Sequence, residues 1–189
     1  MVMEEEIKKC VSLLKEGKVI LYPTDTVWGI GCDATCEEAL TRIYRIKQRN
    51  EKKSMIILLD SIQHLPMYVK KIPLIAWDLL AHVTRPTTFI YQTAYNLPEK
   101  LIHEDGTIAI RIVQNDFCRK VIRALGHPLI STSANIAGEP TPQTFDKISQ
   151  AVISQMDYVV SPDHSTSVEF KPSRLIKFLD DYNFTIIRD

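Results

Sequence analysis

Hydroxyl and carboxylate side chains gather in a loop that follows the first apolar run of the chain. Thr24, Asp25 and Thr26 form this group, and two glycines, Gly29 and Gly31, come shortly after it. Glycine tolerates positive φ and lets a ligand approach the backbone closely. The glycines also begin a G-x-G-x-x-A stretch, but a dinucleotide-binding turn opens directly from its strand, and here six residues intervene. A ligand-binding loop and a plain strand-to-helix loop both fit this segment.

A second group of residues is basic. Six positive charges fall within twelve residues, diluted only by Glu51, and they come from Arg42, Arg45, Lys47, Arg49, Lys52 and Lys53. Such a run is either a solvated helix face or a cradle for phosphate at a helix end. Lys47 and Arg49 share no face of a regular helix, but both can reach one anion if the helix ends near Gln48. No Walker A sequence is present, so a nucleotide site must be of another kind.

A third group is polar without charge. An apolar run that ends at Ile130 leads into Ser131, Thr132, Ser133 and Asn135. Hydroxyl and amide groups can bind phosphate, ribose or a zwitterionic amino acid, and they can equally cap a helix or form a turn. No histidine stands in a recognisable triad with these serines, so the sequence does not support a nucleophilic hydrolase.

An arginine interrupts an otherwise apolar predicted strand. Thr107, Ala109 and Arg111 alternate along the chain, so they share one face of that strand. A charged residue in such a strand either lies near the edge of the sheet or serves a site. The sequence leaves both open.

The elements that must position these groups alternate along the chain. Apolar spacing predicts helices over residues 4–15, from about 36 to 46, 62–83, 117–125 and 145–156. Apolar runs predict strands over residues 19–22, 54–59, 88–91, 107–112, 129–131, 158–161, 174–179 and 183–188. Thr35 and Glu38 have capping-box spacing at the second helix, and Pro66 and Pro73 break the third. We expect a single α/β domain over residues 1–189, built on one twisted, mixed sheet.

Composition and charge limit the function. The chain has 189 residues, 45% of them hydrophobic, with 23 basic and 23 acidic residues and a formal net charge of zero. This hydrophobicity excludes a disordered chain. The charge balance excludes a nucleic-acid binder with a wholly basic surface, but it leaves room for a local basic site.

The cysteines and the N-terminus predict a reduced, cytoplasmic protein without a metal centre or a membrane partner. Cys10, Cys32, Cys36 and Cys118 form no C-x-x-C pair, and no histidine has zinc-ligand spacing. Residues 1–6 are acidic and lack the apolar region of a signal peptide. No apolar run approaches the roughly 20 residues that span a bilayer.

Taken together, the polar segments resemble the YrdC family, also called the TsaC family, whose members are threonylcarbamoyl-AMP synthases. The similarity extends over residues 7–188 in order and spacing. The matching segments are residues 22–34, Lys47-Gln48-Arg49 with Lys53 nearby, Thr107 with Arg111, and 131–135 with Gly138.

The sequence also departs from the family pattern at several positions. Trp28 replaces the usual tyrosine, Arg85 replaces a glycine, Val113 stands in a segment that usually holds a proline, and Arg174 follows Ser173 where the motif has a threonine. The closing arginine-rich turn is reduced to Arg188. These departures keep a second hypothesis open: a divergent member that binds nucleotide or RNA without synthase activity.

The resemblance implies a mixed sheet flanked by helices around a large, concave, positively charged cavity. It implies that L-threonine, bicarbonate and ATP, with Mg²⁺, react to threonylcarbamoyl-AMP and pyrophosphate. A separate tRNA threonylcarbamoyl transferase machinery would then modify tRNA position 37, and tRNA or double-stranded RNA is a candidate partner. Attack of a carbamate oxygen on the α-phosphate needs no covalent enzyme nucleophile, so positioning and charge stabilisation suffice.

The same resemblance implies roles for individual residues. The proposed catalytic group, which would hold the triphosphate, consists of Lys47, Arg49, Ser133 and Asn135. The rest of the ATP site would be formed by Lys53, Thr107, Thr141 and Arg188. Threonine would be bound by Thr24, Thr26, Arg111, Ser131 and Ser173. A guanidinium suits this role because it binds a carboxylate through two hydrogen bonds.

Overall fold

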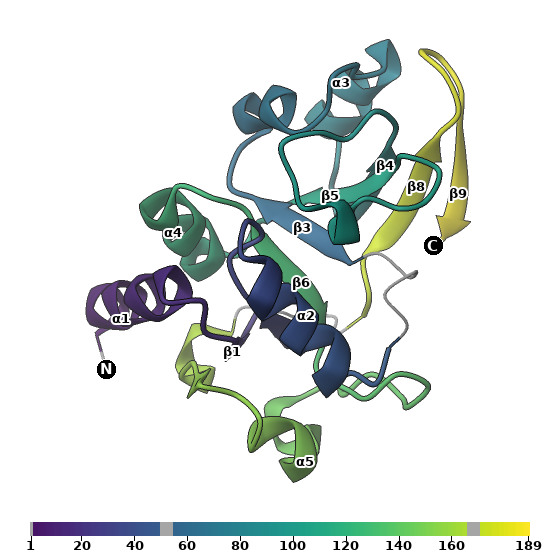
Figure 1. Cartoon of the computed structure of the whole chain (residues 1–189). Helices are drawn as coiled ribbons and strands as arrows, with labels where there is room; N and C mark the ends of the chain where they lie inside the picture. Colours follow the sequence, from purple (N-terminus) through teal and green to yellow (C-terminus); the bar gives the residue numbers. More distant parts are fainter. Residues whose placement is uncertain (1, 50–54, 166–170) are drawn as a thin grey trace.

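A mixed β-sheet forms the centre of the molecule (Figure 1). The computed structural model describes residues 2–49, 55–165 and 171–189. Within these residues, nine strands are hydrogen-bonded in the order β7-β1-β2-β6-β3-β5-β4-β8-β9. Their bounds are β1 Ile20–Tyr22, β2 Gly29–Gly31, β3 Ile56–Leu59, β4 Thr87–Tyr91, β5 Ile108–Ile112, β6 Leu129–Ser133, β7 Tyr158–Val159, β8 Arg174–Phe178 and β9 Phe184–Arg188. The pairs β1–β7, β3–β5 and β4–β8 are parallel and the others antiparallel, so the predicted mixed sheet is confirmed.

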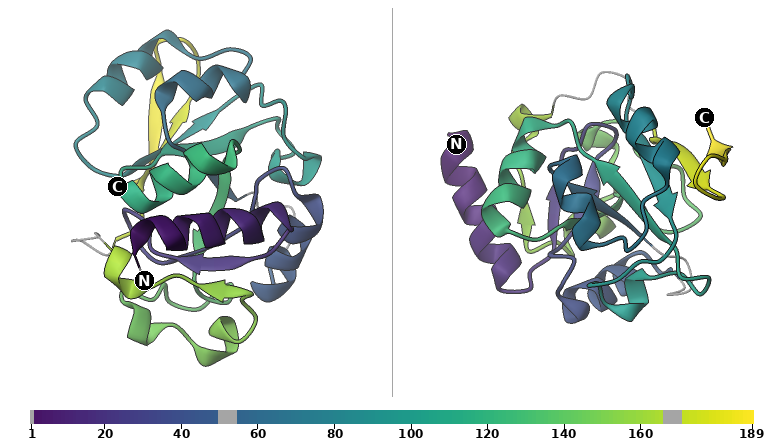
Figure 2. Two further views of the ribbon diagram at one scale, coloured as in Figure 1. Left: turned by 90° about the vertical axis from the view of Figure 1, so that its left-hand side faces the viewer. Right: turned by 90° about the horizontal axis from the view of Figure 1, so that it is seen from above.

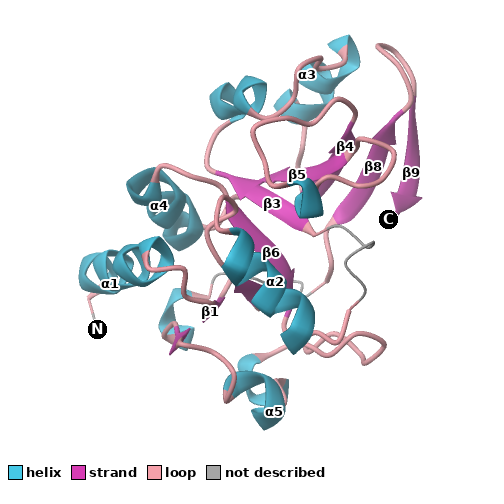
Figure 3. Cartoon of the chain, in the orientation of Figure 1, coloured by secondary structure: helices cyan, strands magenta, loops and turns pink. Residues whose placement is uncertain are grey.

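Helices flank the sheet (Figure 3). The α-helices are α1 Met3–Lys15, α2 Glu37–Ile46, α3 Leu74–Ala81, α4 Asp116–Leu125 and α5 Gln150–Ile153. Short 3₁₀ segments are η1 Ile62–Met67, η2 Glu99–Leu101, η3 Phe145–Lys147 and η4 Pro162–His164. No helix in the described part of the chain is long and apolar enough to cross a membrane.

The two faces of the sheet are covered unequally. One face packs Leu21, Ile57 and Phe89 into a core that includes buried residues of α2, α3 and α5. On the other face, Leu58 joins a second core that α1 and α4 build as they lie side by side (Figure 2). Successive side chains of a strand point to opposite faces, so Ile56 lies on the face of Leu58. There the sheet continues beyond the second core, and this uncovered part carries the candidate site.

Gly29 and Gly31 belong to a strand, so the expectation of a loop there was wrong. β2 lies between β1 and β6, and neither of its glycines has positive φ. A Cβ atom on Gly31 would lie 2.1 Å from the carbonyl oxygen of Ile130 and 2.7 Å from Cε1 of Tyr22. The close approach that requires glycine is therefore between parts of the protein, and no dinucleotide-binding turn is formed.

One capping signal and two helix ranges predicted from the sequence differ from the structure. The helix predicted from about residue 36 is present as α2, but its N-cap Cys36 makes no side-chain cap hydrogen bond. The hydroxyl of Thr35 instead donates to Asp33, 2.7 Å away, so the capping box is absent. The helices predicted over 62–83 and 145–156 are each split into a 3₁₀ segment and a shorter α-helix.

We predict that Gly31→Ala destabilises the protein by about 3 kcal/mol or more, because its methyl group would collide with backbone that cannot move independently of β6. Urea unfolding measures this change. Gly138→Ala is the matched control: its Cβ would meet nothing within 4 Å, but φ is +91°, so we expect only the backbone strain of about 1 kcal/mol. Equal losses in both variants would contradict the packing argument.

Candidate functional site

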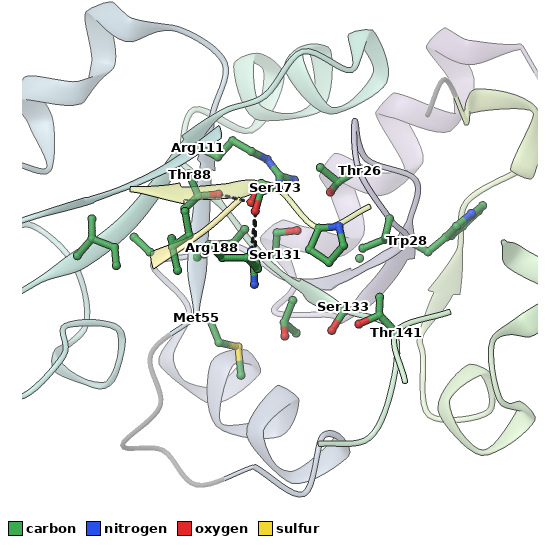
Figure 4. Close-up of a pocket in the computed structure, with 18 of the residues that line it drawn as sticks. Thr26, Trp28, Met55, Thr88, Arg111, Ser131, Ser133, Thr141, Ser173 and Arg188 are labelled. Atoms are coloured by element: carbon green, nitrogen blue, oxygen red, sulfur yellow. Dashed lines mark hydrogen bonds between the residues drawn. The ribbon is translucent and has the colours of Figure 1, made fainter. Parts of the chain in front are cut away.

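A cavity of about 310 Å³ lies on the uncovered part of the sheet (Figure 4). Strands β2, β3, β4, β5, β6, β8 and β9 contribute to its wall. Its polar lining consists of Thr26, Arg49, Thr88, Arg111, Ser131, Thr132, Ser133, Thr141, Ser173 and Arg188. Three guanidinium groups thus share one cavity, and its described lining contains no carboxylate. Such a lining favours a ligand that carries negative charge.

Arg111 lies in the middle of the sheet, not at its edge. β5 is paired with β3 on one side and β4 on the other, and Arg111 is 2% exposed. Its Nη2 lies 3.1 Å from Oδ1 of Asp25, and its Nε is buried without a hydrogen-bond partner. The sequence left two explanations for this arginine, a position near the edge of the sheet or a role in a site. Its central position excludes the edge and supports a role in a site.

The polar loop after β1 holds Arg111 in place. Asp25 accepts a hydrogen bond from the backbone N–H of Gln114 through its other oxygen, at 2.9 Å. The Thr24 hydroxyl donates to the carbonyl of Val27 at 2.7 Å and accepts from the N–H of Thr26. Thr24 therefore stabilises the loop and lies outside the cavity lining, whereas Thr26 is part of it.

The end of α2 separates Lys47 from Arg49. Gln48 has φ of 49°, so the chain leaves the helix there, but only one of the two cations lines the cavity. Arg49 lines the cavity. The ammonium group of Lys47 instead donates to the carbonyl oxygens of Ser133 and Asn135, at 2.5 and 2.6 Å. Lys47 thereby fixes the backbone that follows β6.

Burial lowers the pKa of these cations. Lys47 is 2% exposed, and burial, followed by the nearby charge of Arg49, lowers its pKa from 10.5 to about 8. Burial also lowers the pKa of Arg49. For Arg188, burial and then the charge of Arg111 lower the pKa, which indicates that these two guanidiniums repel each other. An anion between them would relieve that repulsion.

Two further predicted residues lie outside the cavity lining. The amide nitrogen of Asn135 donates to the carbonyls of Ile136 and Glu139, at 3.0 and 2.7 Å, so it closes its own loop. The hydroxyl of Thr107 donates to Asp105 at 2.6 Å. Lys53 lies outside the described residues.

Hydroxyl groups line the side of the cavity formed by β4, β6 and the segment before β8. Ser131 and Ser133 alternate on β6 and face the cavity. Ser173 lies 2.7 Å from Thr88, hydroxyl to hydroxyl, and its carbonyl accepts two hydrogen bonds from Arg188, at 3.1 and 2.8 Å. Sequence reasoning missed Thr88, although its alternation with Ile90 along β4 could have placed it on this face.

Trp28, one of the departures from the family pattern, forms part of the wall of the cavity. Trp28 is 3% exposed, lines the cavity and packs against Phe145 with ring centroids 4.8 Å apart. The indole therefore occupies the wall as an apolar group with an aromatic partner behind it.

A family model named Sua5_yciO_yrdC and described as "Telomere recombination" matches residues 12–189. The chain belongs to this Sua5/YciO/YrdC family. A protein of Pseudoalteromonas translucida named threonylcarbamoyl-AMP synthase is 32% identical over 160 residues, which are 83% of this chain and 86% of that protein. The synthase of Xanthomonas euvesicatoria is 33% identical over 173 residues, or 90% and 91% of the two chains.

Solved structures of the Sua5/YciO/YrdC family share the fold. The crystal structure of P. abyssi Sua5 complexed with L-threonine has a TM-score of 0.85 and 25% identity over 96% of this chain. This chain spans about half of that longer one, 53%. E. coli YciO has a TM-score of 0.82 and 26% identity, covering 97% of this chain and 88% of its own.

We predict that Lys47 titrates near pH 8, well below its ordinary 10.5. Between these values the unfolded chain holds a proton that the folded chain has lost, so the unfavourable burial of this charge diminishes as pH rises. The free energy of unfolding, relative to a Lys47→Met variant, should therefore increase from about pH 8 to about 10.5. Urea unfolding at stepped pH measures it. A difference that is constant over this range would contradict the assignment.

Proposed function

We propose that this chain is a threonylcarbamoyl-AMP synthase, a nucleotidyltransferase that uses L-threonine, bicarbonate and ATP. The observation that carries the proposal is Arg111, a buried guanidinium at the wall of a cavity that also contains Arg49, Arg188 and several hydroxyl groups. The synthases of similar sequence support it, as does the L-threonine complex of the P. abyssi relative.

L-Threonine would bind beside Arg111. Its carboxylate fits the guanidinium, whose Nε has no hydrogen-bond partner in the protein. Thr26, Ser131 and Ser173 line the cavity and offer hydroxyls to the amine and hydroxyl of the substrate. Thr24 would act indirectly, by holding the backbone N–H of Thr26.

ATP would occupy the part of the cavity near Arg49, Ser133, Thr141 and Arg188, all of which line it. Lys47 and Asn135 would shape this region through the backbone after β6, not by contact with the nucleotide. Thr107 would lie at the periphery of the nucleotide site, and the role of Lys53 in ATP binding stays a prediction from the sequence.

Mg²⁺ would enter with the nucleotide. Mg²⁺ prefers oxygen ligands and is commonly held by one or two carboxylates together with substrate phosphates. The described cavity lining contains no carboxylate, and the described residues contain no group of three potential metal ligands. Hydroxyls such as Ser133 suit contact with a phosphate-bound, hydrated Mg²⁺, whose charge would help to neutralise the triphosphate.

The reaction requires the protein mainly to position the substrates and to stabilise charge. The amine of threonine combines with bicarbonate and releases water, which gives a carbamate. A carbamate oxygen then attacks the α-phosphorus, and the bond to the departing pyrophosphate breaks. The guanidiniums of Arg49 and Arg188 would stabilise the charge that develops on the phosphates, and Arg111 would orient the nucleophile.

The product would be used by other enzymes. We propose that a separate tRNA-modifying system consumes the threonylcarbamoyl-adenylate in the cytoplasm, and that tRNA or double-stranded RNA is a further partner of this chain. The alternative, a divergent protein without synthase activity, was motivated by Arg85 and Arg174. Both arginines lie outside the cavity lining, so neither departure replaces a residue that we place in the site.

Pyrophosphate release tests the proposal. The purified chain, incubated with L-threonine, bicarbonate, ATP and Mg²⁺, should release pyrophosphate and form threonylcarbamoyl-AMP, and omission of any one substrate should stop both. A folded protein that gives no product under these conditions would exclude the synthase. Tight RNA binding without a thermal shift by ATP would support the divergent alternative.

Arg49→Ala should lower kcat/KM, because one positive charge that faces the phosphates is removed. The expected loss of transition-state stabilisation is about 2–4 kcal/mol. Steady-state pyrophosphate release measures the loss, and an unchanged melting temperature shows that folding is intact. Arg45→Ala is the control, since Arg45 lies on the exposed face of α2. An Arg49→Ala enzyme as active as Arg45→Ala would show that the phosphates lie elsewhere.

Arg111→Lys should raise KM for threonine about tenfold or more while KM for ATP stays within about twofold, because lysine keeps the charge opposite Asp25 but loses the two-pronged geometry. Lysine is preferable to alanine here, since alanine would leave the buried Asp25 unpaired. Arg119→Lys, on the surface of α4, is the control. A selective loss of ATP affinity would contradict this assignment.

A further inference from the structure

Two arginines that depart from the family pattern converge on one carboxylate. Arg85 precedes β4 and Arg174 begins β8, and both contact Oδ1 of Asp189: Arg174 through Nε at 2.7 Å, and Arg85 through Nη2. The three side chains are 34% to 65% exposed, so the cluster lies at the surface. We call it the Asp189 cluster.

The residue next to Asp189 lines the cavity. The guanidinium of Arg188 donates two hydrogen bonds to the carbonyl of Ser173, and its position in the wall is seen in Figure 4. Arg188 is the last residue of β9, a strand at the edge of the sheet that pairs only with β8 among the described strands. The pairing is irregular here, with a register shift between Leu175 and Ile176.

Several forces act to move Arg188 out of the cavity. The end of an edge strand has hydrogen-bonding partners on one side only, so it frays easily. The charge of Arg111 repels Arg188, whose guanidinium is only partly buried at the wall of the cavity. A fixed position in the wall therefore needs an additional anchor near the end of β9.

We infer that the Asp189 cluster is this anchor: Arg85 and Arg174 hold the carboxylate of Asp189 and thereby position Arg188 in the cavity. Arg174 belongs to β8 and Arg85 to the segment that leads into β4, so the carboxylate joins the end of β9 to both. Asp189 and its partners are positioning residues, because they lie outside the cavity lining and act through Arg188. The inference rests on the proposed function only for the consequence that ATP binding depends on Arg188.

The first test is a mutant cycle on ATP affinity, measured by calorimetry with threonine omitted. Asp189→Ala should weaken ATP binding about three- to tenfold, the range expected when exposed ion pairs that hold one group are lost. In an Arg188→Ala background, Asp189→Ala should have no further effect on ATP affinity, because the guanidinium that Asp189 positions is already absent. Asp189→Glu, which keeps the carboxylate, should restore part of the affinity.

Two controls distinguish positioning from a general effect on stability or charge. Asp116→Ala breaks another exposed ion pair, with Lys120 at 2.8 Å, and should leave ATP affinity unchanged. The double variant Arg85→Ala with Arg174→Ala should reproduce the loss seen in Asp189→Ala. Additive losses in the Asp189→Ala and Arg188→Ala double variant would overturn the inference.

A second readout does not depend on the proposed function. In the intact protein, the Nε–H of Arg188 donates to Ser173, so its NMR signal should be protected from exchange with water. Asp189→Ala should abolish this protection, while Asp116→Ala should keep it. If the signal changes as expected but the wild-type protein neither binds ATP nor releases pyrophosphate, the proposed function fails and the anchor stands. Unchanged protection in Asp189→Ala would overturn the anchor.

Discussion

The buried ion pair between Arg111 and Asp25 is the interaction on which the rest of the site depends. Removing two charges from water is costly, and a buried pair seldom improves stability over an apolar pair of the same size. Here the cost is reduced because Asp25 also accepts a hydrogen bond from the backbone of Gln114. Since stability alone does not explain such a pair, its more direct role is to hold a guanidinium ready at the wall of the cavity. The loop after β1 and the strand β5 are thereby fixed to each other.

The sequence predicted the fold well wherever the signal was local. Apolar spacing was sufficient for α1, α2, α4 and the central strands, because each buries a periodic face. β2 was missed because two of its three residues are glycine, which has little preference for strands. It is a strand only because β1 and β6 lie on either side of it. Thr35 failed as a cap for a similar reason, since Asp33 already binds its hydroxyl.

The sequence identified the right segments for the site but could not assign directions to their side chains. Lys47 and Arg49 look equivalent in the sequence, and so do Ser133 and Asn135. The structure separates both pairs, because the turn at Gln48 redirects the chain after α2 and because β6 ends at Ser133. Lys47 then donates to the carbonyl of Ser133 and Asn135 to that of Glu139, whereas Arg49 and the Ser133 hydroxyl face the cavity. This division depends on contacts between distant segments, which no local pattern encodes.

The zero net charge of the chain is compatible with an anion site because the charges are unevenly paired. Outside the cavity, basic side chains lie against acids, as Arg42 does with Asp157 and Lys177 with Asp105. Within the described lining, three arginines share a small volume without any carboxylate. Arg111 has its acid, Asp25, behind the wall, and Arg188 has Asp189 beside it in the chain. Acids that lie outside the cavity lining orient the arginines of the site without occupying the cavity. The cavity is thereby left for an anion small enough to enter it.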